Sequence, residues 1–157
     1  MQKIGIKRVY EPAEPSDGYR VLVDKLWPRG MSKERLHYDL WAKELAPSAP
    51  LRAWFHAAPE KRWDAFRERY IEELERSPAV QEFAEKTRGE KILTLLYASR
   101  NAAANHARIL RDYLSHLPDW RRSAPDGPQF RNRPEPAGRY FITRRYWLIE
   151  LPVCRRK

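Results

Sequence analysis

The chain has 157 residues, of which 42% are hydrophobic and 33% charged, and its formal net charge is +10. This length suits one domain with its own core, and the hydrophobic content excludes disorder of the whole chain. With the single cysteine Cys154, no secretory signal and no apolar run of membrane-spanning length, we expect a cytoplasmic protein without disulfides or membrane contact.

The first part of the chain predicts two strands. Residues 4–10 alternate apolar and basic side chains, which is typical of a strand, and a turn-rich segment with two prolines follows. A second strand begins at Tyr19 or Arg20, and its apolar run over residues 21–23 ends at Asp24. A continuous apolar run indicates a strand buried on both faces of a sheet, and such strands are usually parallel.

A helical region follows. Ser32 and Ser48 are suitable N-caps for two helices, and Pro59 opens the longest helical stretch. Ser77 and Pro78 begin a further helix, which Gly89 can end with a left-handed C-cap. Apolar residues at three- and four-residue spacing predict the buried face of the longest helix: Trp63, Phe66, Tyr70 and Leu74.

A third buried strand is expected over residues 91–97, and a last helix over residues 102–116. Strands that alternate with helices predict an α/β fold. We expect a single three-layer domain over residues 1–117, with a short, mostly parallel sheet flanked by helices.

Residues 118–157 differ in composition and are predicted to form a basic, Pro/Arg-rich C-terminal extension. They carry 10 Lys and Arg against 4 Asp and Glu, and residues 140–151 could add an edge strand. Aromatic side chains interleaved with arginines can hold single-stranded nucleic acid. A solvated edge strand or a dimer contact would explain the same composition, so the alternatives stay open.

Ligands of parallel sheets collect beyond the carboxyl ends of the strands. At one such end, Asp24 is followed by Lys25, Trp27 and Arg29, and Arg8 lies near the end of the first strand. Asp24 could act as a general base or only hold nearby donors in place. The cations could bind an anion, and Trp27 could stack on a planar ligand or close the core beneath the loop.

A second group of polar residues precedes the last helix. Arg100, Asn101, Asn105 and His106 lie between a strand and a helix, where free backbone N–H groups attract anions. Asn101 is the expected N-cap. His106 could transfer a proton near neutral pH, or it could be a partly buried histidine bonded to a backbone carbonyl.

Other chemistries have little support in the sequence. The remaining histidines lack the paired spacing of metal ligands, and clustered cysteines are absent. There is no dinucleotide or Walker phosphate loop and no nucleophile elbow. We therefore predict no metal site and no cofactor.

Three stretches carry a resemblance to a known family: KRVYEPAEPSDGYRVLVDKLWPRG (residues 7–30), DLWAKELAPSAPLRAWF (39–55) and LLYASRNAAANHA (95–107). Over about residues 1–117 the chain resembles the YeaO-like family of bacterial proteins, which contains a domain of unknown function. The resemblance implies a shared fold and supplies no activity. The family more usually has Arg after Asp24, so Lys25 loses the planar two-pronged donor and leaves that role to Arg29.

Two functional hypotheses follow. The first is a small enzyme that acts on an anionic or nucleotide-like substrate in a strand-end cleft. Asp24 and His106 would be its catalytic residues, and the substrate-binding residues would be Arg8, Lys25, Trp27, Arg29, Arg100, Asn101 and Asn105. The alternative is a module that binds nucleic acid through the basic extension. The first hypothesis requires that Asp24 and His106 come together at one edge of the sheet.

Overall fold

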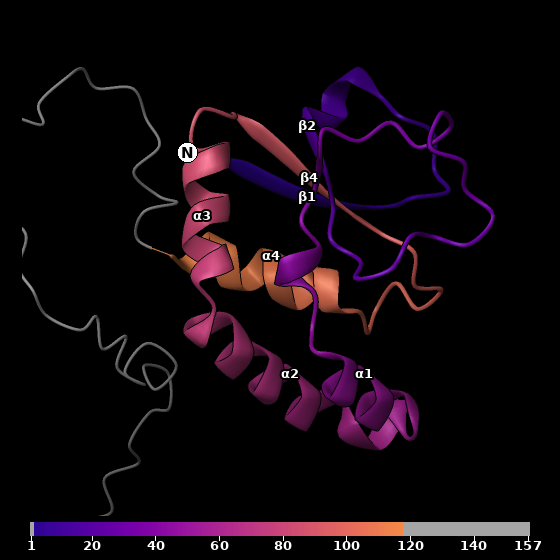
Figure 1. Ribbon diagram of the computed structural model, residues 1–157, viewed down its shortest axis with the longest axis vertical. Coiled ribbons are helices and arrows are strands. Elements are labelled where there is room, and N and C mark those ends of the chain that lie inside the picture. Colours follow the sequence, from indigo (N-terminus) through magenta and orange to yellow (C-terminus); the bar gives the residue numbers. More distant parts are fainter. Residues whose placement is uncertain (1, 118–157) are drawn as a thin grey trace, which may run out of the picture. The chain divides into compact units, whose positions relative to one another are not determined.

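A computed structural model describes residues 2–117 of the chain (Figure 1). The described strands are β1 (Lys3–Arg8), β2 (Tyr19–Leu22), β3 (Leu40–Trp41) and β4 (Ile92–Tyr97). The α-helices are α1 (Ala49–His56), α2 (Pro59–Arg76), α3 (Pro78–Thr87) and α4 (His106–His116), and two 3₁₀ turns are η1 (Pro15–Asp17) and η2 (Lys43–Leu45). The predicted α/β class is confirmed. The extension and its edge strand over residues 140–151 lie outside the described residues.

The strands form one sheet in the order β1-β4-β2-β3, and every neighbouring pair is parallel. Arg8 of β1 lies opposite Tyr97 of β4, and Leu22 of β2 lies opposite Leu96. The strands therefore end together, and the loops that follow them share one edge of the sheet. The two-residue strand β3 extends this edge beside β2 and was not predicted.

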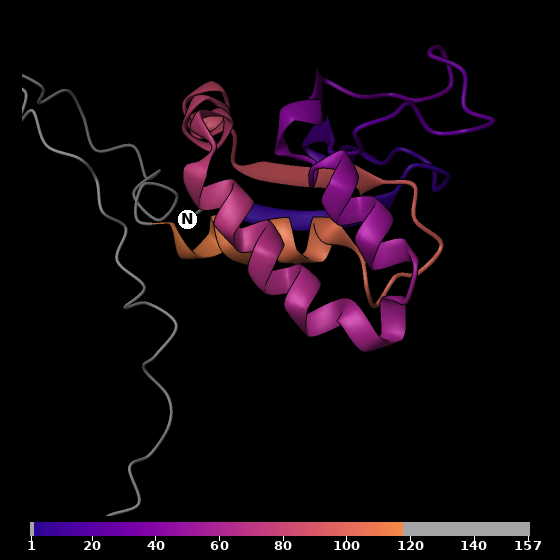
Figure 2. The ribbon, with the colours of Figure 1, turned by 60° about the horizontal axis from the view of Figure 1, so that its bottom comes forward.

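One core cluster joins the helices to the sheet, and Figures 1 and 2 show α4 lying next to the sheet with α2 beyond it. The predicted buried face of α2 is confirmed, with Phe66, Tyr70 and Leu74 buried and Trp63 packed at the margin of the cluster. Helix α4 adds the buried side chains Ala107, Ile109, Leu110, Tyr113 and Leu114. Serine caps begin α1 and α3 as predicted, because Ser48 and Ser77 accept backbone N–H groups of the first turn.

A second, smaller cluster contains Val9, Leu22, Met31, Leu36 and Leu96. Leu22 and Leu96 are completely buried in this cluster, whereas the residues that precede them on their strands, Val21 and Leu95, belong to the first cluster. Side chains alternate along a strand, so this cluster lies on the opposite face of the sheet. Irregular chain between β2 and β3 supplies Met31 and Leu36, and this segment takes the place of a covering helix.

The predicted helix after Ser32 is therefore wrong. Ser32 does cap one turn, because its hydroxyl accepts from Arg35 N at 3.2 Å and its carbonyl accepts from Leu36 N at 3.1 Å. The turn does not continue, since Leu36 packs into the second cluster and the chain then extends into β3. Pairing with β2 outweighs local helix propensity here.

Two predicted helix ends are also corrected. Helix α3 ends at Thr87 without a left-handed glycine, since the glycines with positive φ in the described chain are Gly18 and Gly30. Helix α4 begins at His106 with Asn105 as its cap, because the Asn105 side chain accepts from Arg108 N at 3.1 Å. Asn101 instead caps a separate turn, in which its side chain accepts from Ala103 N and Ala104 N at 2.9 Å. In the described chain, no helix has the length and apolar character needed to span a membrane.

Candidate functional site

Asp24 and His106 lie together at the shared strand-end edge. Asp24 follows β2, and His106 is the first residue of α4. Asp24 Oδ1 lies 3.3 Å from His106 Nε2, and each side chain is 15% exposed. The parallel sheet therefore brings together the two residues that the sequence placed in one site.

Further hydrogen bonds tie this pair to the backbone. Asp24 Oδ2 accepts from Ala98 N at 2.7 Å, directly after β4. His106 Nε2 lies 3.1 Å from the carbonyl oxygen of Val23, and the indole N–H of Trp41 donates to the carbonyl of Asp24 at 2.8 Å. Both carboxylate oxygens thus have partners within the fold. The pair joins β2, β4 and the beginning of α4.

The side chain of Tyr70 lies behind His106. The two rings meet edge to face, with their centroids 6.4 Å apart. Burial raises the pKa of Tyr70 well above its ordinary value, and the charges of Glu73 and Asp24 act in the same direction. Tyr70 therefore stays protonated and donates to the carbonyl of Leu45 at 2.6 Å. The hydrogen bond to Leu45 therefore holds the Tyr70 ring in place beside His106.

We expect Asp24→Ala to lower the free energy of unfolding by about 2 kcal/mol, because Ala98 N loses a charged acceptor in a part-buried position. Urea denaturation followed by circular dichroism measures this change. Asp64→Ala on the exposed side of α2 is the control and should change stability by less than about 0.5 kcal/mol. Equal stability of the two variants would show that the Asp24 bonds are unimportant for folding.

Two predicted binding residues in the loop after Asp24 have partners within the fold. Lys25 Nζ lies 3.6 Å from Glu44 Oε2. The indole N–H of Trp27 donates to the carbonyl of Met31 at 2.6 Å, and its ring meets the rings of Tyr38 and Trp41 edge to face. Trp27 thus packs beneath the loop, which was one of its two predicted roles.

The other predicted binding residues are spread along the edge. The guanidinium of Arg8 lies 5.2 Å from the centroid of the Tyr10 ring. Arg29, Arg100 and Asn101 are exposed, whereas Asn105 is buried as the cap of α4. Within residues 2–117, none of the predicted cations forms an ion pair with Asp24. The structure therefore supports the predicted Asp24–His106 contact more than a common cluster of cations.

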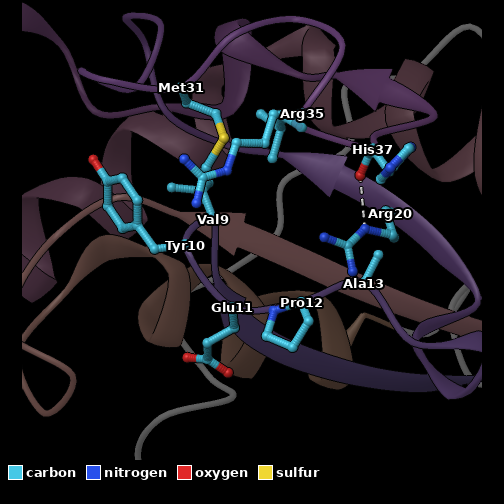
Figure 3. A pocket seen from close by; sticks show the side chains of 10 residues that line it. Val9, Tyr10, Glu11, Pro12, Ala13, Arg20, Met31, Arg35 and His37 are labelled. Carbon is cyan, nitrogen blue, oxygen red and sulfur yellow. Dashed lines mark hydrogen bonds between the residues drawn. The ribbon is translucent and has the colours of Figure 1, made fainter.

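A cavity of about 440 Å³ lies between the segment after β1 and the segment before β3 (Figure 3). We refer to it as the Arg20 cavity. Its lining contains none of the residues predicted as site residues. The lining residues are Val9, Tyr10, Glu11, Pro12, Ala13, Arg20, Met31, Arg35, Leu36 and His37.

Arg20 is the buried charge of this cavity, and the residue is 6% exposed. Its Nε donates to the carbonyl of His37 at 2.7 Å, and its Nη1 forms an ion pair with Asp17. Lys7 Nζ lies 3.0 Å from Asp17 Oδ1, so two cations share one carboxylate. Thr94 also donates its hydroxyl proton to the carbonyl of Asp17 at 2.7 Å, which fixes η1 above the sheet.

The carboxyl of Asp17 has a lowered pKa. Burial acts to raise it, but the hydrogen bond from Glu14 N, the hydrogen bond from Lys7 and the charge of Arg20 outweigh burial. Burial acts to lower the pKa of Lys7, but its hydrogen bonds to Asp17 and Glu14 raise it. Asp17 is therefore ionised and Lys7 is protonated across the neutral range.

This site was not predicted, although the position of Arg20 in the sequence indicates it. Arg20 stands between Tyr19 and the apolar run 21–23, and a charged residue inside a buried strand requires a partner. Arg20 pairs with Asp17 because η1 lies beside it, and no local sequence pattern predicts the position of η1. Within residues 2–117, no group of three or more His, Cys, Asp or Glu side chains could hold a metal ion.

Comparison with known proteins identifies the family. A family model described as "Inactive DUF488-N3 subclade" matches residues 3–129, so the chain belongs to this family. The resemblance to YeaO-like proteins is confirmed, because the chain is 46% identical over 114 residues to the uncharacterized protein YeaO of Escherichia coli (strain K12). That alignment covers 73% of this chain and 98% of the relative.

A second relative comes from a distant bacterium. An uncharacterized protein of Mycobacterium tuberculosis (strain ATCC 25618 / H37Rv) is 42% identical over 113 residues, which is 72% of this chain and 94% of the relative. No solved structure matches the chain. The comparisons therefore define a family and no activity.

Proposed function

We propose that this domain binds a small molecule with an oxyanion group in the Arg20 cavity. The observation that carries the proposal is the guanidinium of Arg20. The residue is 94% buried and lines the cavity, yet its Nη2 has no hydrogen-bond partner among the described residues. A guanidinium nitrogen with no acceptor in the fold can donate to a ligand, and a bound carboxylate or phosphate would supply that acceptor.

Two further groups in the cavity support an anionic ligand. Arg35 and His37 line the same space and are exposed. The carboxylate of Glu11, which would repel an anion, accepts from Arg8 N at 3.3 Å. Figure 3 shows this carboxylate pointing away from the guanidinium groups of Arg20 and Arg35. The groups that face the cavity are therefore mainly donors.

Asp17 does not cancel this positive charge. Its carboxylate is shared between Arg20 and Lys7, and the side chain of Glu14, which also pairs with Lys7, is 59% exposed. Water screens an exposed carboxylate such as Glu14 more than it screens a buried guanidinium. The cavity volume of about 440 Å³ falls within the usual range for small-molecule sites.

The test is calorimetric titration of the protein with benzoate and with its neutral analogue benzamide. We expect benzoate to bind and benzamide to bind at least about tenfold more weakly. Arg35→Ala should weaken benzoate binding by about tenfold, whereas Lys33→Ala removes the same charge outside the lining and should leave it unchanged. Equal binding of the two compounds, or equal effects of the two variants, would contradict the proposal.

A second pair of variants locates the site. Ala13 is an exposed lining residue, so Ala13→Trp should fill the cavity and abolish benzoate binding without removing a charge. Ala53→Trp places the same side chain on the exposed side of α1 and should leave binding intact. If Ala13→Trp binds benzoate like the wild type, the ligand lies elsewhere.

An enzyme that acts on an anionic substrate at the strand ends is the second candidate, and the Asp24–His106 contact favours it. Against turnover stand the hydrogen bond that Asp24 Oδ2 accepts from Ala98 N and the word "inactive" in the description of the matching family. Product formation from a nucleotide or sugar phosphate, lost in His106→Gln, would favour this candidate. Nucleic-acid binding by residues 118–157 remains a prediction outside the described residues.

A further inference from the structure

We infer that the ligand of the Arg20 cavity carries a planar, largely apolar ring beside its oxyanion group. This inference rests on the proposed function and specifies the ligand class of the same site. The apolar and aromatic residues of the lining support it. Aromatic carboxylates and phosphate esters of planar rings share the required chemistry.

Part of the cavity lining is apolar. Val9, Met31 and Leu36 belong to the second core cluster, and each reaches the cavity surface. Pro12 and Ala13 continue this surface. Val9, Met31 and Leu36 are at most 8% exposed, so the apolar surface left for a ring to cover is mainly that of the exposed residues Pro12 and Ala13. A ring would also occupy the volume that a bare ion cannot fill.

Tyr10 is the aromatic side chain of this lining, and it is unusual in being both exposed and fixed. It is 45% exposed, although its hydroxyl donates to the carbonyl of Arg29 at 3.0 Å. The guanidinium of Arg8 lies 5.2 Å from the ring centroid. Arg8 is not a lining residue, so the part of the ring that it does not cover is available to the cavity.

A fixed aromatic ring is a favourable surface for stacking, because little conformational freedom remains to be lost when a ligand binds. Figure 3 shows Tyr10 and Met31 at one end of the cavity and His37 and Arg20 at the other. Figure 3 also shows the guanidinium of Arg35 at the Tyr10 end, so the cavity has a cation at each end and an aromatic ring at one of them. A ligand that satisfies both ends has a ring at Tyr10 and an oxyanion at Arg20.

The experiment compares phenyl phosphate with methyl phosphate, and benzoate with acetate, by calorimetric titration. We expect the aromatic member of each pair to bind at least about tenfold more tightly. Comparing the two aromatic compounds, the tighter-binding one shows whether the preferred oxyanion is a phosphate or a carboxylate. Tyr10→Ala should remove most of the aromatic preference and retain methyl phosphate or acetate binding, because Tyr10 is not a source of charge.

The control is Tyr10→Phe, which keeps the ring, loses the bond to the carbonyl of Arg29 and should keep the preference. Equal affinity within both pairs would overturn the inference and leave the proposed function standing. An unchanged aromatic preference in Tyr10→Ala would also overturn it. If the wild type binds none of the four compounds, both the inference and the proposed function fail.

Discussion

Asp17→Ala is expected to destabilise the domain by about 3 kcal/mol, which is the scale for removing one partner of a buried ion pair. Asp17 is 6% exposed and pairs with both Lys7 and Arg20. Without it, Arg20 remains buried with one partner fewer, and Glu14 N also loses its acceptor. Urea denaturation at pH 7 measures the change, and the exposed residue Asp64 supplies the control variant Asp64→Ala.

The same variant tests a pH dependence with a definite sign. The pKa of Asp17 is lowered in the fold from its ordinary value of 3.8, so the folded state favours the ionised form. Its contribution to stability is full above the unfolded pKa and is lost as the pH falls through the lowered, folded pKa. Between about pH 5 and pH 2, the wild type should lose more stability than Asp17→Ala. Parallel stability curves would show that Asp17 is not the group responsible.

Gly18→Ala is the second substitution with a large expected effect, again about 3 kcal/mol. Gly18 has φ 62° and ψ −135°, a backbone conformation that side-chain-bearing residues rarely adopt. An added Cβ would also lie 2.5 Å from the backbone oxygen of Ile92, which β4 holds in place. Thermal and urea denaturation should both show the loss.

Gly89→Ala is the matched control for Gly18→Ala. A Cβ at Gly89 would meet no atom within 4 Å, and its φ is not positive. We expect a change within about 0.5 kcal/mol, on the stabilising side, because alanine reduces the freedom of the unfolded chain. If the two alanine variants are equally stable, backbone conformation at Gly18 is not a constraint on the fold.

These two residues connect stability to the proposed site. Gly18 lets the chain turn from η1 directly into β2. Asp17, in η1, pairs with the guanidinium of Arg20, which lines the cavity. Gly18→Ala should therefore weaken ligand binding even where the protein remains folded, because η1 would shift relative to Arg20. The exposed position of Arg35 makes it the better residue for testing binding alone.

The main elements of the fold could be predicted because they depend on local patterns. The apolar runs at residues 21–23 and 91–97 marked buried strands, and Ser48 and Ser77 marked helix starts. The two-residue strand β3 is too short to show a period. The segment after Ser32 failed because the packing of Leu36 against the sheet decides its conformation, which propensity does not describe.

The candidate site was predictable only where topology alone decides it. Parallel strands end at one edge, the enzyme hypothesis required Asp24 and His106 to meet there, and they lie 3.3 Å apart. The roles predicted for the nearby cations remain proposals. The Arg20 cavity depends instead on how η1 and the segment before β3 fold over one face of the sheet, and neither has a periodic pattern that fixes its position.

The most direct test of the proposed function is a crystal structure of the protein with 4-bromobenzoate, whose bromine can be located by anomalous scattering. The proposal predicts a carboxylate oxygen within about 3 Å of Arg20 Nη2, and the bromine at the end of the cavity that Tyr10 and Met31 line. A ligand bound beside Arg29 or Arg100 at the strand ends, with Arg20 Nη2 still without an acceptor, would contradict it.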